Sequence, residues 1–376
     1  MDFDFSQQQY EFRDTLQDFL AREYPLERHI EAAGRPEIDA RLWQGLAGLG
    51  LFGALVPEQH DGLGLGLVDL ALAVEELGKA LAPLPVFETL IGTDLLVRHG
   101  SAAQQQRWLP QLAAGRTRLA LAVTEAQSGF GLANLAATAR ADGHGLRLAG
   151  SKILVPELAS ADLLLVAARG GPGHAPALVL AEPAGCALEQ HTTLEITGRF
   201  HRLDLAGIAP DRAGWLGLEP SPAAAERLQN VAAAVAAGSM IGTAGRTLDI
   251  AVAYAGTREQ FGRPIGSFQA IKHRCADMDV AADAGRTAAY YAAWAVAEGG
   301  AEGARAASIA KSYCGDAARF ICNEAIQVHG GIGFTWELGL HHYLRRAKFL
   351  EYCWGDASFH RERVLQQTLA GLGSEH

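Results

Sequence analysis

The apolar positions in the first part of the chain recur with the spacing of α-helices. Ser6 and Gln9 are placed to form a capping box, and the apolar residues after them share one helical face: Phe12, Leu16, Phe19 and Leu20. A second helix is predicted over 67–81, with Glu75 and Glu76 on its polar side. We therefore expect an N-terminal helical domain over residues 1–117.

The pattern changes near Leu119, where short apolar runs begin to alternate with turn signals. Asp142-Gly143 is a hairpin signal, and a glycine-rich turn at 170–173 separates the apolar runs 162–168 and 175–181. Strands joined by short turns pair antiparallel. The pattern thus predicts a small antiparallel β domain over residues 118–220.

From about Ser221 the chain is rich in alanine and helical again. Four long helices are predicted, at 222–256, 268–298, 303–328 and 337–370. Abundant alanine favours close packing of helices, so residues 221–376 are expected to form a helix bundle. The fold class is thus mainly α with a central antiparallel β domain.

Composition and charge restrict the range of functions. The formal net charge of −10 argues against a general nucleic-acid binder, which would carry a basic patch. No apolar run is long enough to cross a bilayer, and the acidic N-terminus shows no secretory signal, so a cytoplasmic protein is expected. Five cysteines without a C-x-x-C pair, and the scattered His329, His341 and His342, favour neither a disulfide framework nor a metal site.

The stretch from Arg258 to Gln269 is unusual for a connection between two helices. Arg258 offers a planar fork suited to phosphate oxygens, Gln260 and Gln269 are amides, and Phe261 and Phe268 have flat apolar faces. The chain is bent between them by two glycines and a proline. A dinucleotide cofactor presents both a pyrophosphate and flat rings, so this stretch is a candidate dinucleotide site.

A second candidate lies at Gln327-Val328-His329-Gly330-Gly331-Ile332-Gly333-Phe334-Thr335. A glycine-rich turn after a helix is often only its C-cap. Three glycines within four positions also allow the backbone to approach a ligand closely, and Gln327 could then bind a polar edge or a phosphate. Both interpretations stay open on the residues alone.

Together, and in this order after a helix–β–helix pattern, the two stretches resemble the acyl-CoA dehydrogenase family over essentially the whole chain. Shorter stretches that also match are Val56-Pro57-Glu58, Glu75-Glu76-Leu77-Gly78, Arg107-Trp108-Leu109-Pro110 and Thr124-Glu125. The resemblance implies N-terminal helices, a barrel-like central β domain and a C-terminal four-helix bundle. It also implies a dimer or tetramer built on those bundles, with FAD lying across a subunit interface.

By resemblance, the ADP half of FAD meets residues from both stretches: Arg258, Gln260, Phe261, Phe268, Gln269, Gln327, Val328, Gly330 and Gly331. In the family these residues come from the subunit opposite the one that holds the flavin ring. The implied reaction is α,β-dehydrogenation of an acyl-CoA thioester in fatty acid or steroid side-chain degradation, with electron-transfer flavoprotein as acceptor. A carboxylate base removes the α-proton while the β-hydrogen passes as hydride to the flavin.

The chain departs from the family where that base is expected. Counting on from Arg346-Ala347-Lys348, Trp354 stands where the family has a glutamate. An indole only donates a hydrogen bond and cannot act as a base. Some relatives place the glutamate on the first bundle helix, but residues 230–238 contain no carboxylate. Glu351 and Asp356 flank Trp354, and a displaced base there stays an open alternative.

The β domain departs as well. The family's Thr-Glu-Pro-x-x-Gly-Ser-Asp ends here in Phe130-Gly131, and its Trp-Ile-Thr is here Leu154-Val155-Pro156. The losses fall on parts that would hold the flavin ring and remove the proton, whereas the stretches donated to a neighbouring subunit are retained. Three hypotheses follow: a dehydrogenase acting alone or as the non-catalytic half of an α2β2 enzyme, a flavin oxidase or monooxygenase of the same fold, and a structural subunit that alone binds neither FAD nor CoA.

Overall fold

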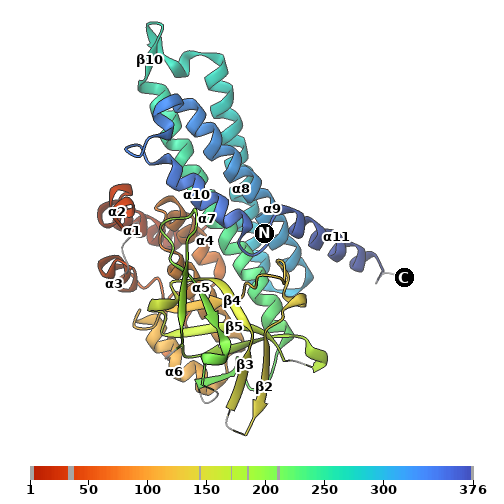
Figure 1. The fold of residues 1–376 in the computed structure, drawn as a ribbon. Coiled ribbons are helices and arrows are strands. Elements are labelled where there is room, and N and C mark those ends of the chain that lie inside the picture. Colours follow the sequence, from red (N-terminus) through yellow and green to blue (C-terminus); the bar gives the residue numbers. More distant parts are fainter. Residues whose placement is uncertain are drawn as a thin grey trace. The chain divides into compact units, whose positions relative to one another are not determined.

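The computed structural model describes residues 4–32, 38–143, 145–170, 172–183, 186–209 and 212–373 (Figure 1). They fall into two compact units. One gathers Met1–Ile30, Leu67–Ala82 and Asn230–His376, and the other gathers Glu31–Gly66 and Pro83–Gln229. Because each unit combines separate stretches of the chain, the domain boundaries expected at 117 and 220 stay a prediction.

The first unit is helical. Its helices are α1 (Gln7–Glu23), α4 (Leu67–Lys79), most of α7 (Pro222–Thr257), α8 (Gln269–Glu298), α9 (Gly300–His329), α10 (Leu340–Tyr352) and α11 (Ala357–Gly373), while α2 (Leu26–Ala32) lies where the two units divide. The capping box of Ser6 and Gln9 is confirmed at the start of α1. The single helix expected over 337–370 is wrong: Cys353–Asp356 separate α10 from α11, and Gly355 has a φ of +108° that a helix cannot hold.

Glycines bring α4 and α7 into backbone contact. A Cβ added to Gly78 would lie 2.3 Å from the carbonyl oxygen of Ser239, and one added to Gly242 would lie 2.0 Å from that of Glu75. Both distances are shorter than any real contact, so only glycine permits this crossing. The bundle therefore includes α4 as a closely packed member.

The expectation that Glu75 and Glu76 lie on an exposed polar side of α4 is wrong, because both are buried. Glu75 Oε1 lies 3.2 Å from Lys79 Nζ and 3.2 Å from Arg286 Nε of α8, and Tyr290 donates its hydroxyl to Glu75. Burial opposes the charged carboxylate, but the two cations outweigh it and lower the pKa of Glu75. Paired charges thus hold α4 against α8.

The second unit combines helices with two sheets. Its helices are α3 (Ala40–Gly48), α5 (Leu84–His99) and α6 (Ala102–Ala113), and its strands are β1 (Leu119–Ala122), β2 (Thr138–Asp142), β3 (Gly145–Ala149), β4 (Ser151–Pro156), β5 (Leu163–Arg169), β6 (Pro176–Ala181), β7 (Leu188–His191), β8 (Phe200–Asp204) and β9 (Ala213–Trp215). One sheet runs β3-β2-β5-β6-β9 with β1 beside β5, and the other runs β4-β8-β7. A single apolar cluster takes side chains from both sheets, among them Leu148, Val166, Val155 and Leu203.

The larger sheet is mixed rather than purely antiparallel. The hairpins expected at 142–143 and 170–173 are confirmed by antiparallel pairing of β2 with β3 and of β5 with β6. Strand β1 instead pairs parallel with β5, from Leu119↔Leu163 to Ala122↔Val166. Turn signals cannot reveal this pairing, because the two strands are far apart in the sequence.

The main-chain donors of β1 are completed by α5. Leu119 donates its N–H to Thr89 Oγ1 at 3.3 Å, and Leu121 donates to Glu88 Oε2 at 3.1 Å. Burial raises the pKa of Glu88 well above its usual range, and the neighbouring carboxylate of Glu157 adds to the shift. The fold class, mainly α with a central β domain, is confirmed. Among the residues described, no helix combines the length and apolar character that crossing a membrane requires.

Candidate functional site

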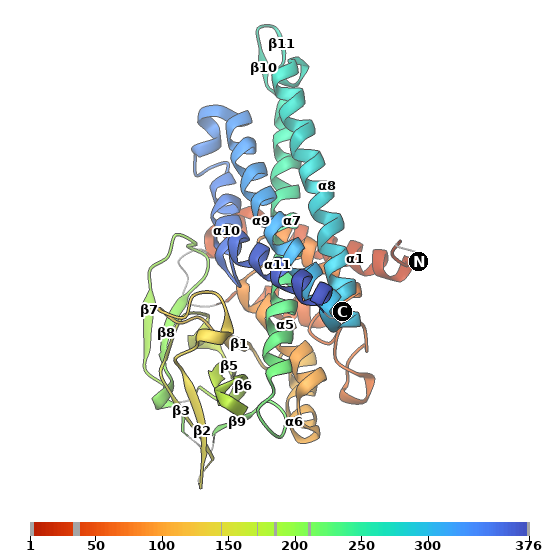
Figure 2. The ribbon, with the colours of Figure 1, turned by 90° about the vertical axis from the view of Figure 1, so that its right-hand side faces the viewer.

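The first predicted stretch forms a hairpin at the end of the helical unit. Strands β10 (Glu259–Gln260) and β11 (Arg263–Pro264) pair antiparallel after α7 ends and before α8 begins (Figure 2). Phe261 and Gly262 form the two-residue turn, and both have positive φ, at 54° and 76°. Two positive φ values define a type I′ turn, for which asparagine and glycine are the usual residues.

Phe261 is the unusual member of this turn. A bulky residue on left-handed backbone is an outlier, and strain of this kind is concentrated at functional sites. Its side chain is 93% exposed. The ring meets Phe268 edge-on with centroids 6.1 Å apart, and Arg263 lies 4.2 Å from the centroid of Phe268 in a cation–π contact. The hairpin therefore presents apolar rings together with positive charge.

The remaining residues of this stretch flank the hairpin. Arg258 directly follows α7, its carbonyl oxygen accepts the N–H of Ile265 at 2.8 Å, and its side chain is exposed. Gln269 is the first residue of α8 and is exposed, as is Gln260. Among the described residues no carboxylate pairs with the Arg258 guanidinium, which leaves its planar fork open to an anion.

The second predicted stretch lies at the C-terminal end of α9, where Gly330–Phe334 form the 3₁₀ turn η8. His329 stacks on Tyr254 of α7 with centroids 4.3 Å apart, which places this end of α9 beside the end of α7. Open space lies beside Gly330 and Gly331, since a Cβ on either would have no atom within 4 Å. Val328 is buried, so only its main chain can reach a ligand.

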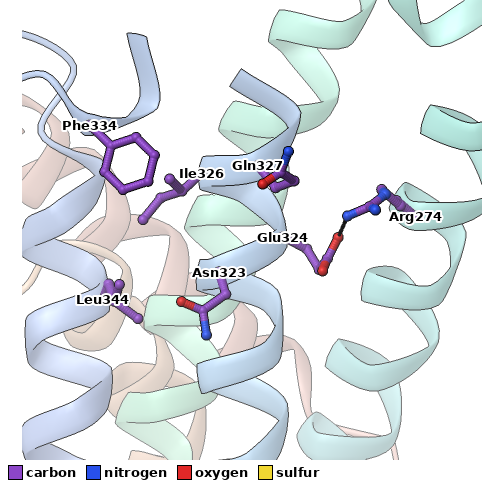
Figure 3. A pocket seen from close by; sticks show the side chains of 7 residues that line it. All are labelled: Arg274, Asn323, Glu324, Ile326, Gln327, Phe334 and Leu344. Atoms are coloured by element: carbon purple, nitrogen blue, oxygen red, sulfur yellow. Dashed lines mark hydrogen bonds and ion pairs between the residues drawn. The ribbon is translucent and has the colours of Figure 1, made fainter. Parts of the chain in front are cut away.

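Gln327 lines a cavity of about 430 Å³, within the range of small-molecule sites (Figure 3). Its other lining residues are Arg274, Asn323, Glu324, Ile326, Phe334 and Leu344. Arg274 of α8 forms an ion pair with Glu324 of α9 at one side of this cavity (Figure 3). Of the lining residues, Gln327 and Phe334 belong to the predicted stretch, and the sequence prediction missed the others. Asn323 and Gln327 are four apart, the spacing that places two amides on one helical face.

Trp354 lies in the linker between α10 and α11, with a φ of 64°. Its two acidic neighbours are engaged elsewhere. Glu351 lies 2.7 Å from Lys348 Nζ and 3.3 Å from Arg319 Nε, whereas Asp356 accepts the N–H of Phe359 at 2.8 Å as the cap of α11. These contacts disfavour Glu351 or Asp356 as a displaced base.

In the β domain, a buried ion pair closes the loop that follows Thr124-Glu125. Glu125 Oε1 lies 2.6 Å from Lys152 Nζ, and the same carboxylate accepts the N–H groups of Ala136 at 2.6 Å and Ala137 at 3.1 Å. Burial lowers the pKa of Lys152 to about 8. Glu125 thus serves to close the loop that carries Phe130, whose side chain is exposed.

The position of the family's Trp-Ile-Thr is also irregular. Strand β4 breaks register against β8 between Lys152 and Val155. Leu154 lies in this bulge with a φ of 52° and is exposed, while Pro156 has no N–H to donate. The hydroxyl of the family's threonine therefore has no counterpart at 156.

Comparison with known proteins identifies the family. The model for the acyl-CoA dehydrogenase N-terminal domain matches residues 6–116, and that for the C-terminal domain matches residues 222–369. The chain belongs to the acyl-CoA dehydrogenase family. The acyl-CoA dehydrogenase FadE34 of Mycobacterium tuberculosis is 36% identical over 93% of this chain, which spans only 44% of that relative's length.

Solved structures of acyl-CoA dehydrogenase type match over nearly the full chain. A variant of the Tcur3481-Tcur3483 steroid ACAD has 32% identity and a TM-score of 0.90, covering 98% of this chain and 99% of that one. The ChsE4-ChsE5 complex of Mycobacterium tuberculosis has 27% identity and a TM-score of 0.88, covering 98% and 99%. An acyl-CoA dehydrogenase complexed with FAD from Bacillus anthracis has 26% identity and a TM-score of 0.90, covering 99% and 68%.

Proposed function

We propose that this chain is the FAD-completing, non-catalytic subunit of a mixed acyl-CoA dehydrogenase. One observation carries the proposal: the residues that the resemblance assigns to the ADP half of FAD come together at one end of the bundle, most of them exposed, whereas Trp354 stands where the resemblance expects the base. A homologous partner with the family's glutamate would supply the chemistry. The proposed product is the α,β-unsaturated acyl-CoA, with electrons leaving to electron-transfer flavoprotein.

The described residues fit the ADP half of a flavin dinucleotide. Arg258 would bind pyrophosphate oxygens through charge-assisted hydrogen bonds, and the open backbone at Gly330 and Gly331 would let the cofactor approach closely. Gln327 lines a cavity with amide, apolar and charged walls, which suits a ring with polar edges. The further cofactor contacts in the proposal are Gln260, Phe261, Phe268, Gln269 and the main chain of Val328.

Bound FAD would supply the hydride acceptor, and the remaining requirement is a base for the α-proton. Trp354 cannot meet it, since its indole N–H only donates. Glu351 is paired with Lys348 and Arg319, and Asp356 caps α11. The chain's own contribution is therefore to hold and orient the cofactor, while proton removal falls to the partner.

The solved relatives support a mixed assembly. ChsE4-ChsE5 is a complex of two differently named chains, and the name of the Tcur3481-Tcur3483 steroid ACAD likewise joins two. We infer a similar pairing for this chain, with an acyl-CoA of steroid side-chain or fatty acid type as substrate.

Flavin content of the purified chain tests the proposal most directly. The chain would be produced alone and also with a homologue that has glutamate at the position matching Trp354, and FAD per subunit and acyl-CoA turnover would be measured. We expect little FAD in the isolated chain and both FAD and turnover in the complex. Stoichiometric FAD with strong dehydrogenase activity in the isolated chain would contradict the proposal.

The variant Arg258→Ala tests the assigned cofactor contact. In the complex it should weaken FAD binding by about 1.5–3 kcal/mol, the usual value of a hydrogen bond to a charged group. Arg305→Ala is the matched control, because Arg305 is an exposed arginine near the opposite end of α9, paired with Glu302. Equal flavin retention in both variants would contradict the assignment of Arg258 as a cofactor contact.

A further inference from the structure

Two buried side chains hold the linker that carries Trp354. Lys311 of α9, 2% exposed, donates from Nζ to the carbonyl oxygens of Glu351 at 3.0 Å and Gly355 at 2.7 Å. His360 of α11 has no exposed surface, and its Nε2 lies 2.9 Å from the carbonyl oxygen of Trp354. Because a carbonyl oxygen only accepts, this nitrogen must carry the ring proton. Two consecutive carbonyls of the linker thus each have a buried donor.

The linker that they hold is strained. Trp354 has a φ of 64° and Gly355 a φ of 108°. A Cβ at 355 would lie 2.3 Å from Cδ1 of Phe359, so the chain passes tightly over the first turn of α11. A bulky residue with a φ in this region persists only where its surroundings enforce the conformation. The hydrogen bonds from Lys311 and His360 provide that enforcement.

Burying the polar ends of Lys311 and His360 costs more free energy than a merely structural contact requires. Burial lowers the pKa of Lys311 to about 8, against the opposing effects of Cys353, Cys314, Glu351 and Asp356. Burial also lowers the pKa of His360 to about 3, helped by the positive charges of Lys311 and Arg363. Apolar side chains would fill the same space without this penalty. The polar ends of Lys311 and His360 therefore serve to position the two carbonyls.

We propose that Lys311 and His360 are positioning residues that fix the backbone at position 354 and so set the direction in which its side chain leaves the chain. The inference rests on the proposed function for the importance of position 354. It adds that Lys311 and His360 bind main-chain carbonyls, so they fix the backbone whichever side chain stands at position 354. The indole of Trp354 is thus held in a defined place rather than left to move with the linker.

The fluorescence of Trp354 tests this in the full-length chain, with no flavin or partner required. Each variant would be prepared with Trp354 and with Trp354→Phe, so that the difference spectrum isolates this indole from the other tryptophans of the chain. The variants are Lys311→Met, which keeps the stem and removes the donors, His360→Leu, which removes the donor, and His360→Gln, which keeps an N–H donor. Lys348→Met is the control, since Lys348 also lies near the linker but its ammonium pairs with the Glu351 side chain and lies over the Tyr352 ring.

We expect iodide quenching of Trp354 to rise severalfold in Lys311→Met and His360→Leu, with a shifted emission maximum. His360→Gln and Lys348→Met should resemble the parent chain. Unchanged quenching in a folded Lys311→Met variant, or equal perturbation by His360→Gln and His360→Leu, would overturn the proposal. If Lys311→Met does not fold, the two His360 variants decide. Since flavin plays no part, this result is separate from the outcome for the proposed function.

Discussion

The buried pair of Glu125 and Lys152 yields a prediction that can be worked through from its contacts. The Lys152 side chain has no exposed surface and that of Glu125 is 5% exposed, with 2.6 Å between Nζ and Oε1. Lys152→Met leaves the carboxylate with its two main-chain donors but without its cation. Glu125→Gln leaves the ammonium without its carboxylate. Because each single change strands one buried partner, each should lower the free energy of unfolding by about 3–5 kcal/mol.

The double variant should lose less free energy of unfolding than the two single variants added together. The amide oxygen of the introduced glutamine can still accept the N–H groups of Ala136 or Ala137, and the introduced methionine fills the volume of the lysine stem with no charge to satisfy. Contacting residues couple by about 0.5–3 kcal/mol, and the short distance here places the pair near the upper end. We expect the double variant to cost about 2–3 kcal/mol less than the two single costs added together.

Denaturant unfolding of the four proteins measures this cycle, and hydrogen exchange at Ala136 and Ala137 locates the change in the loop. Arg107→Met serves as control, because Arg107 forms an exposed ion pair with Glu182 in the same unit and should change stability by less than about 1 kcal/mol. The reasoning would be refuted if the double variant lost as much stability as the two single variants together. A Lys152→Met variant as stable as Arg107→Met would refute it as well.

Two further predictions concern the packing that supports the site. Because the pKa of Glu88 is raised in the folded protein, the stability that this residue contributes is complete below its unfolded-state pKa and is lost as pH rises. Glu88→Gln should therefore gain thermal stability relative to wild type as pH is raised from the acidic range towards neutrality. A difference in melting temperature that is constant across this range would contradict the prediction. Gly242→Ala should destabilise by about 1–3 kcal/mol because its Cβ meets the Glu75 carbonyl, whereas Gly256→Ala on the same helix has open space and should be neutral or stabilising; equal melting temperatures for the two variants would argue against the close helix crossing.

Much of the fold could be predicted because local patterns dictate it. Helical spacing in α1 and α4 and the turn at Asp142-Gly143 depend on residues close together in the chain. The burial of Glu75 could not be predicted, since its partners Arg286 and Tyr290 lie more than two hundred positions later. The parallel pairing of β1 with β5 was hidden for the same reason.

At the candidate site, residue types pointed to a dinucleotide, and family resemblance supplied individual roles. The break before α11 was missed although Gly355 and Asp356 are a turn residue and a helix-capping residue, because the helical pattern on both sides suggests one continuous helix. Its conformation is imposed by Lys311 and His360, from α9 and α11. Asn323 and Leu344 were missed because their significance lies in a shared cavity rather than in any motif.

The exposed ring of Phe261 has a consequence for how the cell must produce this protein. With 93% of its surface in water, the side chain offers other chains an apolar contact at the tip of a projecting hairpin. Beside it lies the half-buried ring of Phe268, with centroids 6.1 Å apart, so the tip offers two aromatic rings to a binding molecule. In the proposed mixed assembly, matched synthesis of the two chains, as from one transcript, would keep this ring covered from the moment of assembly.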